Sequence, residues 1–149
     1  MSHIAELEVG GTLPEIQLSP VTRLDLIKYA GASGDFNPIH TIDAEAKDVG
    51  LPAIIAHGMW TMGSLAKLFT SHYEEGFIKD YSIRFRGMVF IDDVITLKAT
   101  LAEKDSKKLT FTVAAVNQHE KDVMNGSIVF SKNHIGEMLI DGNGVVGFE

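Results

Sequence analysis

The chain has 149 residues, of which 45% are hydrophobic and 22% are charged, and its formal net charge is −7. This length suits one domain with a real core, and the composition is near that of an average soluble globular protein, which argues against disorder and against a membrane protein. The acidic balance would repel a polyanion, and no concentrated basic patch offsets it, so nucleic-acid binding is not expected.

Residues 1–11 (MSHIAELEVGG) contain no basic region followed by an apolar run, so no signal peptide is predicted. The chain has no cysteine, which excludes disulfides, thiolate metal ligands and a cysteine nucleophile, and suits a reducing compartment. We therefore expect a cytoplasmic protein whose chemistry comes from His, Asp, Glu, Ser, Thr or Tyr.

Residues 22–30 (TRLDLIKYA) predict the first helix. Thr22 can cap it, and Asp25 lies at the third helical position, where an acidic side chain completes a capping box. The helix should end near Gly31. The roughly helical apolar stripe of this segment consists of Leu24, Ile27 and Tyr29.

The next segment, residues 32–40 (ASGDFNPIH), is predicted to be a loop. Its turn-forming residues are Gly34, Asp35, Asn37 and Pro38. Pro38 also disfavours helix at the residue before it. A short helix is then predicted within residues 43–50 (DAEAKDVG), ended by Gly50.

Residues 54–69 form the longest apolar stretch, but His57, Gly58 and Lys67 interrupt it, so it does not predict a bilayer-spanning helix. From Gly58 to about Thr70 the run is apolar on nearly every face, which predicts a helix enclosed by protein. Small residues that permit close approach of another backbone are Gly63, Ser64 and Ala66.

The second half of the chain changes to a period of two, which predicts half-buried antiparallel strands. The alternating apolar residues are Tyr81, Ile83 and Phe85; Ile95, Leu97, Ala99 and Leu101; and Leu109, Phe111, Val113 and Ala115. Turns are predicted at residues 105–108 and 117–122, and a further strand at about residues 123–131.

One sheet with one face on a buried helix is an α+β layer arrangement, and we expect residues 1–149 to form a single domain. Its core should cover about residues 7–131. The glycine-rich tail, residues 132–149, is expected to be a terminal hairpin or loosely ordered. Edge strands need cover, which dimerisation would supply.

Asp35 and His40 lie five residues apart on the turn-rich loop, where both side chains can be aimed at one point. Such a pair can share proton transfer, since one group accepts a proton from water while the other orients or donates. On spacing alone, an Asx turn beside a histidine is the more frequent explanation.

A second group of candidate residues, Ala56-His57-Gly58-Met59, lies where a loop enters the buried helix. Helix starts offer unpaired N–H groups and a positive dipole end, and glycine permits close approach of a ligand, so this site can hold a developing oxyanion. For His57, capping or tying down the helix entrance is the expected role. Gly58 could equally be a packing glycine.

Together, YAGASGDFNPIH and LPAIIAHGMWTMG resemble the signature of the MaoC-like, R-specific enoyl-thioester hydratase and dehydratase family. The resemblance covers roughly residues 7–131 and leaves out the tail. It implies a hot-dog fold, in which a long antiparallel sheet wraps around one central helix, here residues 58–70. The expected reaction is reversible syn addition of water to a trans-2-enoyl thioester, which gives an R-3-hydroxyacyl thioester.

By this resemblance, Asp35 and His40 are the catalytic pair, Asn37 shapes or polarises the loop, and the Gly58 amide binds the thioester carbonyl oxygen. His57 and Met59, at the same helix start, are further candidates for substrate contact. No metal or redox cofactor is needed. Some relatives carry a serine in the central helix at the position that aligns with Ala66; the nearest hydroxyls here are Ser64 and Thr61.

The expected partner is acyl-coenzyme A or an acyl carrier protein thioester, and coenzyme A is favoured because no basic docking face for an acidic carrier is evident. A homodimer is expected, and a heterodimer is possible. Two alternatives stay open: a non-catalytic acyl-binding subunit of a heteromeric dehydratase, and a metal-dependent enzyme that uses Asp35, His40 and His57. Thioester hydrolysis also occurs in hot-dog proteins, but this loop resembles the hydratase pattern.

Overall fold

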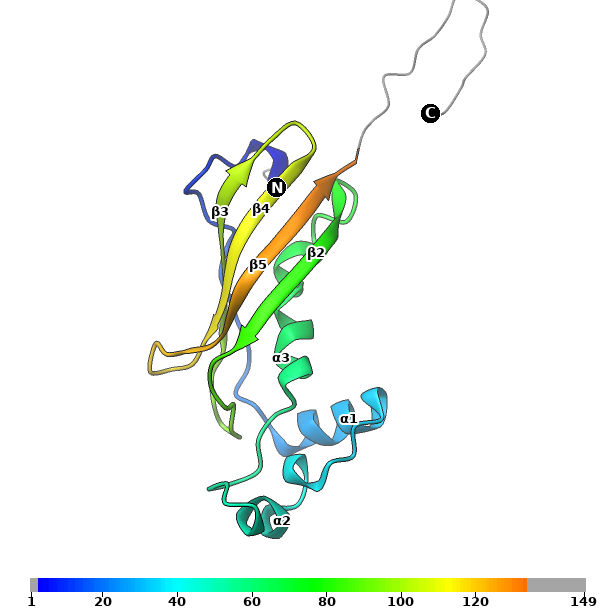
Figure 1. The fold of residues 1–149 in the computed structure, drawn as a ribbon, viewed down its shortest axis with the longest axis vertical. Coiled ribbons are helices and arrows are strands. Elements are labelled where there is room, and N and C mark those ends of the chain that lie inside the picture. Colours follow the sequence, from blue (N-terminus) through cyan, green and yellow to red (C-terminus); the bar gives the residue numbers. More distant parts are fainter. Residues whose placement is uncertain (1–2, 134–149) are drawn as a thin grey trace, which may run out of the picture.

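The computed structural model describes residues 3–133 (Figure 1). Within these residues the elements in chain order, with η for a 3-10 helix, are η1 (Ile4–Glu6), β1 (Ile16–Gln17), α1 (Arg23–Ser33), η2 (Pro38–His40), α2 (Asp43–Asp48), α3 (Gly58–Leu65), α4 (Lys67–Thr70), β2 (Gly76–Phe85), β3 (Thr96–Lys104), β4 (Lys108–Val116) and β5 (Asp122–Lys132). In this part of the chain no helix has the length and apolar character that a membrane crossing requires.

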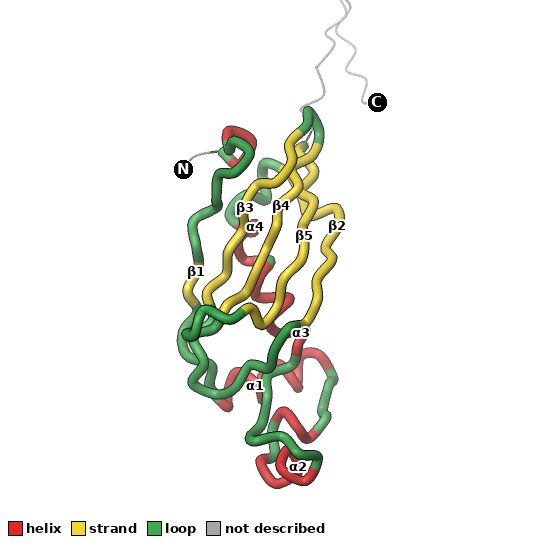
Figure 2. The backbone as a smooth tube through the Cα atoms, turned by 60° about the vertical axis from the view of Figure 1, so that its left-hand side comes forward, coloured by secondary structure: helices red, strands yellow, loops and turns green. Residues whose placement is uncertain are grey.

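The strands form one sheet in the order β1-β3-β4-β5-β2, in which every neighbouring pair is antiparallel. α3 runs along one face of this sheet, while α1 and α2 lie beyond one of its ends (Figures 1 and 2). The core fills the space between sheet and helix. Fully buried side chains there include Leu65, Leu97, Leu101, Phe111, Ile128 and Phe130. The predicted α+β fold, an antiparallel sheet around a central helix, is confirmed.

β3 and β4 bury the side chains predicted to face inward, because a strand places alternate side chains on the same face. β2 departs from this pattern at its end. Tyr81 and Ile83 are partly buried, but Phe85 is 57% exposed, so the inward-facing prediction was wrong there. β5 continues to Lys132, and the predicted terminal hairpin lies, from residue 134 onward, outside the described residues.

The central helix is interrupted at Ala66, where a continuous helix over residues 58–70 was predicted. Ala66 keeps helical dihedral angles (φ −62°, ψ −18°), so the chain tightens there without leaving the helical region. Just before this point, the Ser64 hydroxyl donates a hydrogen bond to the Trp60 carbonyl at 2.8 Å. A serine that bonds back by four residues often bends a helix, which accounts for the interruption.

The start of α1 is the predicted capping box. The Asp25 N–H donates to Thr22 Oγ1 at 3.1 Å, and the Thr22 N–H donates to Asp25 Oδ2 at 2.9 Å. The helix runs past the predicted end at Gly31 and stops at Gly34, whose φ of +74° is the left-handed conformation that suits glycine. Because Gly34 ends the helix, Asp35 is the first residue of the loop that follows α1.

The buried face of α1 was predicted wrongly. Leu26 and Ala30, four residues apart, are buried, whereas Leu24 and Ile27 are 55% and 50% exposed. Leu26 and Ala30 have helical spacing, and so do Leu24 and Ile27. The face of α1 that is buried is therefore set by which pair packs against the rest of the protein.

The N-terminal segment is held to the far end of the central helix by Glu75. Its carboxylate accepts the Ile4 N–H at 2.8 Å and the His72 Nδ1–H at 2.9 Å, and lies 3.5 Å from His3 Nδ1. Burial raises the pKa of Glu75, but the hydrogen bonds from His72 and Ile4, with the nearby histidines, outweigh it, so the pKa lies below its usual value.

Replacing Glu75 with glutamine should lower the free energy of unfolding at neutral pH by about 1–2 kcal/mol, because two bonds to a carboxylate are weakened. Since folding lowers this pKa, the contribution is present above the unfolded-state pKa and disappears as the pH falls through the folded-state value. Urea denaturation over a pH series measures the difference, with the exposed neighbour Glu74→Gln as the control. If the difference in unfolding free energy between wild type and Glu75→Gln does not shrink as the pH falls, the stabilising role of the Glu75 carboxylate is contradicted.

Candidate active site

Two consecutive Asx-type turns shape the loop after α1. Asp35 Oδ1 accepts the Asn37 N–H at 3.2 Å, and Asn37 Oδ1 accepts the Ile39 N–H at 3.2 Å, which caps η2. Pro38 opens this 3-10 turn and His40 ends it. Asp35 consequently stays about half exposed, while His40 is only 7% exposed.

The orientation of His40 is set by the main chain of the segment before α3. Its Nδ1–H donates to the Ile55 carbonyl at 2.7 Å. In the neutral ring, Nε2 is then the nitrogen with a free lone pair, and it lies 3.9 Å from Asp35 Oδ2. This separation is too long for a direct hydrogen bond and fits one water that contacts both atoms at about 2.8 Å.

His57 is almost completely buried, at 2% exposed, beneath this pair. It occupies the N-cap position of α3, but its side chain makes no capping hydrogen bond, so of the two predicted roles capping was wrong and tying down the helix entrance agrees with the structure. Its Nε2–H instead donates to the Asp35 carbonyl at 3.0 Å, and its ring stacks on His40 with centroids 3.7 Å apart. Burial, assisted by the neighbouring His40, lowers the pKa of His57 against the opposing effects of the Asp35 carbonyl and carboxylate, which disfavours the charged ring.

Gly58 is the first residue of α3, where the N–H groups have no partner within the helix. A Cβ added here would lie 2.5 Å from Cε1 of Phe85, so the glycine allows that ring to cover the helix start. A cavity of about 140 Å³ borders Gly58, Thr61 and Phe85. Both predicted roles of Gly58, packing and close approach of a ligand, are compatible with this geometry.

The family model described as "MaoC like domain" matches residues 7–123, which are most of the chain and include Asp35, His40, His57 and Gly58. The chain belongs to this family. The predicted resemblance is thereby confirmed.

The MaoC-like domain is similar to proteins with named activities. The 3-hydroxybutyryl-CoA dehydratase of Methylorubrum extorquens is 33% identical over 103 residues, which cover 68% of this chain and 64% of that protein. The peroxisomal hydratase-dehydrogenase-epimerase of Saccharomyces cerevisiae is 36% identical over 89 residues, which cover 60% of this chain but 10% of that protein. The chain thus corresponds to a small part of the yeast relative.

Among solved structures, the R-hydratase PhaJ1 from Pseudomonas aeruginosa in the unliganded form superposes with a TM-score of 0.79 at 27% identity. The alignment covers 86% of this chain and 83% of that one. The hot-dog architecture is therefore shared over nearly the whole described part of the MaoC-like domain.

Three of the predicted site residues lie close together in the structure, and Met59 lies away from the cavity beside Gly58. Asp35, His40 and His57 meet, and Gly58 follows directly in the chain. Met59 is 54% exposed and does not line the cavity beside Gly58. Thr61 lines that cavity, whereas Ser64 does not line it and donates its hydroxyl proton to the Trp60 carbonyl within the helix.

Three contributors to the site were not predicted. The Ile55 carbonyl orients His40, but a main-chain group has no residue-specific signal in a sequence. The Tyr29 ring, assigned to the apolar stripe of α1, instead lies 4.7 Å from the His57 ring. The Phe85 ring was predicted only as an alternating apolar residue of a half-buried strand, and its contact with the start of α3 at Gly58 was not foreseen.

A metal site is a poor description of the three grouped side chains. Asp35, His40 and His57 offer ligand atoms within 4.8 Å of one another. However, the two imidazoles are stacked with 23° between their planes, and nitrogen lone pairs lie in the ring plane. They therefore do not converge on one ion at the usual distance of about 2.1 Å.

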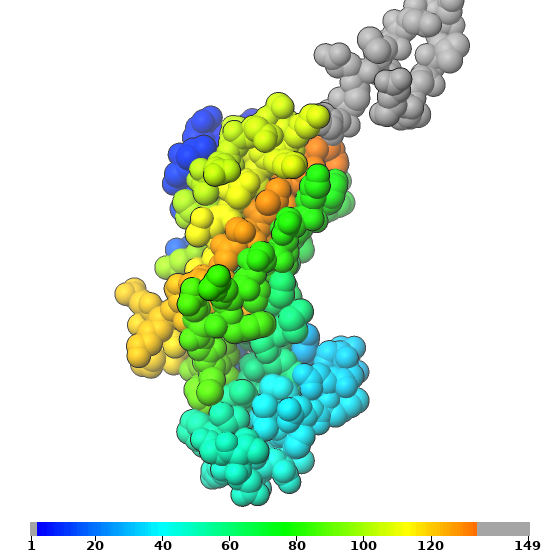
Figure 3. Space-filling view, viewed as in Figure 1, coloured from blue at the N-terminus to red at the C-terminus, as the bar shows by residue number. Residues whose placement is uncertain are grey.

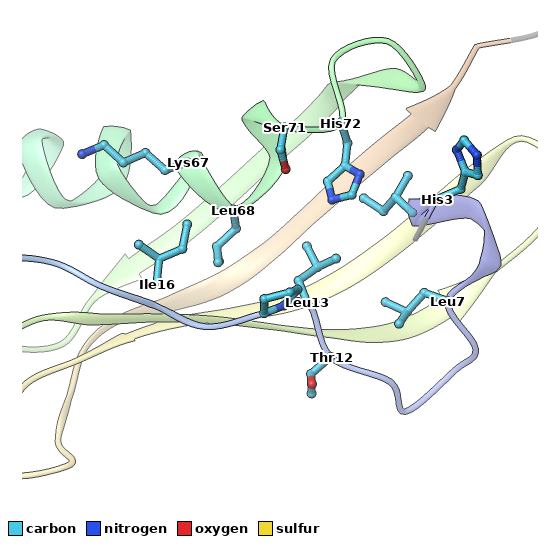
Figure 4. Close-up of a pocket in the computed structure, with 11 residues that line it drawn as sticks. His3, Leu7, Thr12, Leu13, Ile16, Lys67, Leu68, Ser71 and His72 are labelled. Carbon is cyan, nitrogen blue, oxygen red and sulfur yellow. The ribbon is translucent and has the colours of Figure 1, made fainter. Parts of the chain in front are cut away.

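A larger cavity, about 320 Å³, lies at the other end of the central helix, between α4 and the N-terminal segment (Figure 4). Apolar side chains such as Leu13, Ile16 and Leu68 point into it. His72 also lines it, but its Nδ1 is bound to Glu75. This cavity contains no pair resembling Asp35 and His40. The smaller cavity is not lined by that pair either, but it borders Gly58, which directly follows His57 in the chain, so it is the better candidate for substrate binding.

Proposed function

We propose that the MaoC-like domain catalyses reversible syn addition of water to trans-2-enoyl thioesters, which gives R-3-hydroxyacyl thioesters. The observation that carries this proposal is the 3.9 Å separation of Asp35 Oδ2 and His40 Nε2, with the Nδ1–H of His40 held by a carbonyl. The names of its relatives, a 3-hydroxybutyryl-CoA dehydratase and an R-hydratase, support the same reaction class.

In the proposed mechanism, a water bound between Asp35 and His40 loses a proton to His40 Nε2 as its oxygen bonds to C3 of the substrate. The electrons of the C2–C3 double bond move toward the thioester carbonyl. The Gly58 N–H and the start of α3 stabilise the resulting enolate oxygen. The proton taken from water then returns to C2 from the same face, so water is added as a whole and no cofactor is consumed.

The proposed substrate is a coenzyme A thioester. The sequence carries 13 Lys and Arg against 20 Asp and Glu, which suits a small ligand that needs few cations better than an acidic carrier protein. An acyl carrier protein thioester is the alternative. A cytoplasmic location and a single domain over residues 1–149 remain predictions.

A homodimer is the proposed assembly, and a heterodimer is the alternative. β2 is the last strand in the sheet order, so its outer edge is unpaired among the described residues. In Figure 3 this strand lies at the surface beside β5. Phe77 and Phe85, both 57% exposed, lie on it. An open edge with exposed apolar side chains favours pairing with another chain.

The test is the ultraviolet absorbance of the enoyl-thioester bond, measured with purified protein and crotonyl-coenzyme A and then with longer enoyl chains. We expect the absorbance to fall until hydration reaches equilibrium, and chiral analysis of the product to give the R-3-hydroxyacyl thioester. No change with any coenzyme A or carrier-protein substrate would leave the non-catalytic subunit as the better explanation. An S product would contradict the proposed stereochemistry.

A further inference from the structure

His57 contacts both residues proposed to act on water. It follows Ile55, whose carbonyl binds His40, and precedes Gly58, at the start of α3. Its Nε2–H reaches 22 residues back along the chain to the Asp35 carbonyl. A carbonyl can only accept, so this nitrogen carries the proton. The bond holds the main chain of Asp35 against the entrance of α3.

The His57 ring also supports His40 from one face. The two rings are nearly parallel, 23° apart with centroids separated by 3.7 Å, while Tyr29 contacts His57 with a tilted ring. The hydrogen bond to the Ile55 carbonyl restricts rotation of the His40 ring about its Cβ–Cγ bond, and the stacked His57 ring restricts tilting of its plane. His57 therefore restrains both partners of the 3.9 Å gap, Asp35 through its main chain and His40 through its ring face.

The two nitrogens of His57 are both unsuited to contact substrate. Nε2 is bound to the Asp35 carbonyl, and Nδ1 is buried with no hydrogen-bond partner. An apolar side chain in this place would avoid the unpartnered nitrogen, yet would lose the donor that Asp35 needs. A flat ring with one N–H meets both geometric requirements.

We propose that His57 is a positioning residue, which holds Asp35 and His40 at a distance that one water can bridge. This inference rests on the proposed hydration and replaces the substrate contact predicted for His57. Misplacement of a catalytic group by about 1 Å can reduce turnover by about 10²-fold. Loss of His57 should therefore act on kcat and leave KM almost unchanged.

The decisive comparison is His57→Gln against His57→Met. Both side chains have similar length, but only the glutamine amide can donate to the Asp35 carbonyl. We expect kcat for hydration to fall about 10²-fold in the methionine variant, and at least several-fold less in the glutamine variant, with KM within twofold of wild type in both. Equal kcat in the two variants, or a rise in KM with kcat retained, would overturn the proposal. Thermal melts of both variants identify any loss of folded protein.

A second measurement does not depend on activity. Long-range ¹H–¹⁵N correlation of the histidine rings in the wild-type protein reports which nitrogen carries the proton. We expect His57 as a neutral ring with the proton on Nε2 at neutral pH, and the proton of His40 on Nδ1. A charged His57, or one with its proton on Nδ1, overturns the positioning geometry. If these tautomers are found but no enoyl thioester is hydrated, the proposed function fails and the geometry stands.

Discussion

Replacing His40 with asparagine should reduce kcat for hydration of crotonyl-coenzyme A by about 10²- to 10⁴-fold, the usual contribution of a positioned acid–base group. Asparagine is preferable to alanine because its amide can still donate to the Ile55 carbonyl, which His40 Nδ1 binds at 2.7 Å. His40 is 7% exposed and stacked on His57, so alanine would also leave a gap in a packed region.

Asp35→Asn is the companion to this variant. It keeps the oxygen that accepts the Asn37 N–H at 3.2 Å and removes only the charge, so the loop should keep its shape while kcat falls. His119→Asn is the matched control for His40→Asn, because it replaces an exposed histidine in the β4–β5 turn with the same residue. Turnover near the wild-type level in both the His40 and Asp35 variants would refute the water-bridged mechanism. Steady-state kinetics, with circular dichroism to verify folding, decide the matter.

Replacing Gly58 with alanine should reduce kcat by about 10²- to 10³-fold, the range seen when one oxyanion donor is lost. The added Cβ would lie 2.5 Å from the Phe85 ring and beside the N–H proposed to bind the thioester oxygen. The methyl group thus obstructs the approach of the carbonyl, and also forces the Phe85 ring to move. Because Phe85 is 57% exposed, its ring can turn toward solvent, so the protein should stay folded.

A double mutant separates the two consequences of that methyl group. If the loss in Gly58→Ala comes from obstruction of the amide, Phe85→Leu will not restore kcat in the combined variant. If it comes from a displaced Phe85 ring, the combined variant will recover to the level of Phe85→Leu alone, and the oxyanion role of Gly58 is then rejected. Gly63→Ala, in the same helix and with open space around the added Cβ, is the matched control and should be close to neutral.

Much of this protein could be predicted from neighbours in the sequence. Thr22 and Asp25 form the predicted capping box, and the turn-forming residues around Asp35 and Asn37 do form the predicted loop. The alternation in β3 and β4 correctly identifies the buried faces. These features depend on hydrogen bonds and periodicity within a few residues, so the residue types themselves determine them. The candidate pair, Asp35 and His40, was predicted through the family resemblance, because spacing alone favoured an Asx turn beside a histidine.

Other features were decided only when distant segments met. The buried face of α1 depends on which of two equally spaced apolar pairs contacts the rest of the chain, and the exposed Phe85 ring depends on the start of α3 beside it. The tautomer of His40 follows from the Ile55 carbonyl, 15 residues away, and the orientation of His57 from the Asp35 carbonyl, 22 residues away. Every residue has a main-chain carbonyl, so no sequence pattern distinguishes the carbonyls of Ile55 and Asp35 from the others. The residues proposed to carry the chemistry could be named from motifs that resemble a family, because those motifs lie within short segments of the chain. Which nitrogen of each ring carries the proton, and how far apart the groups lie, depend on contacts between segments distant in the sequence.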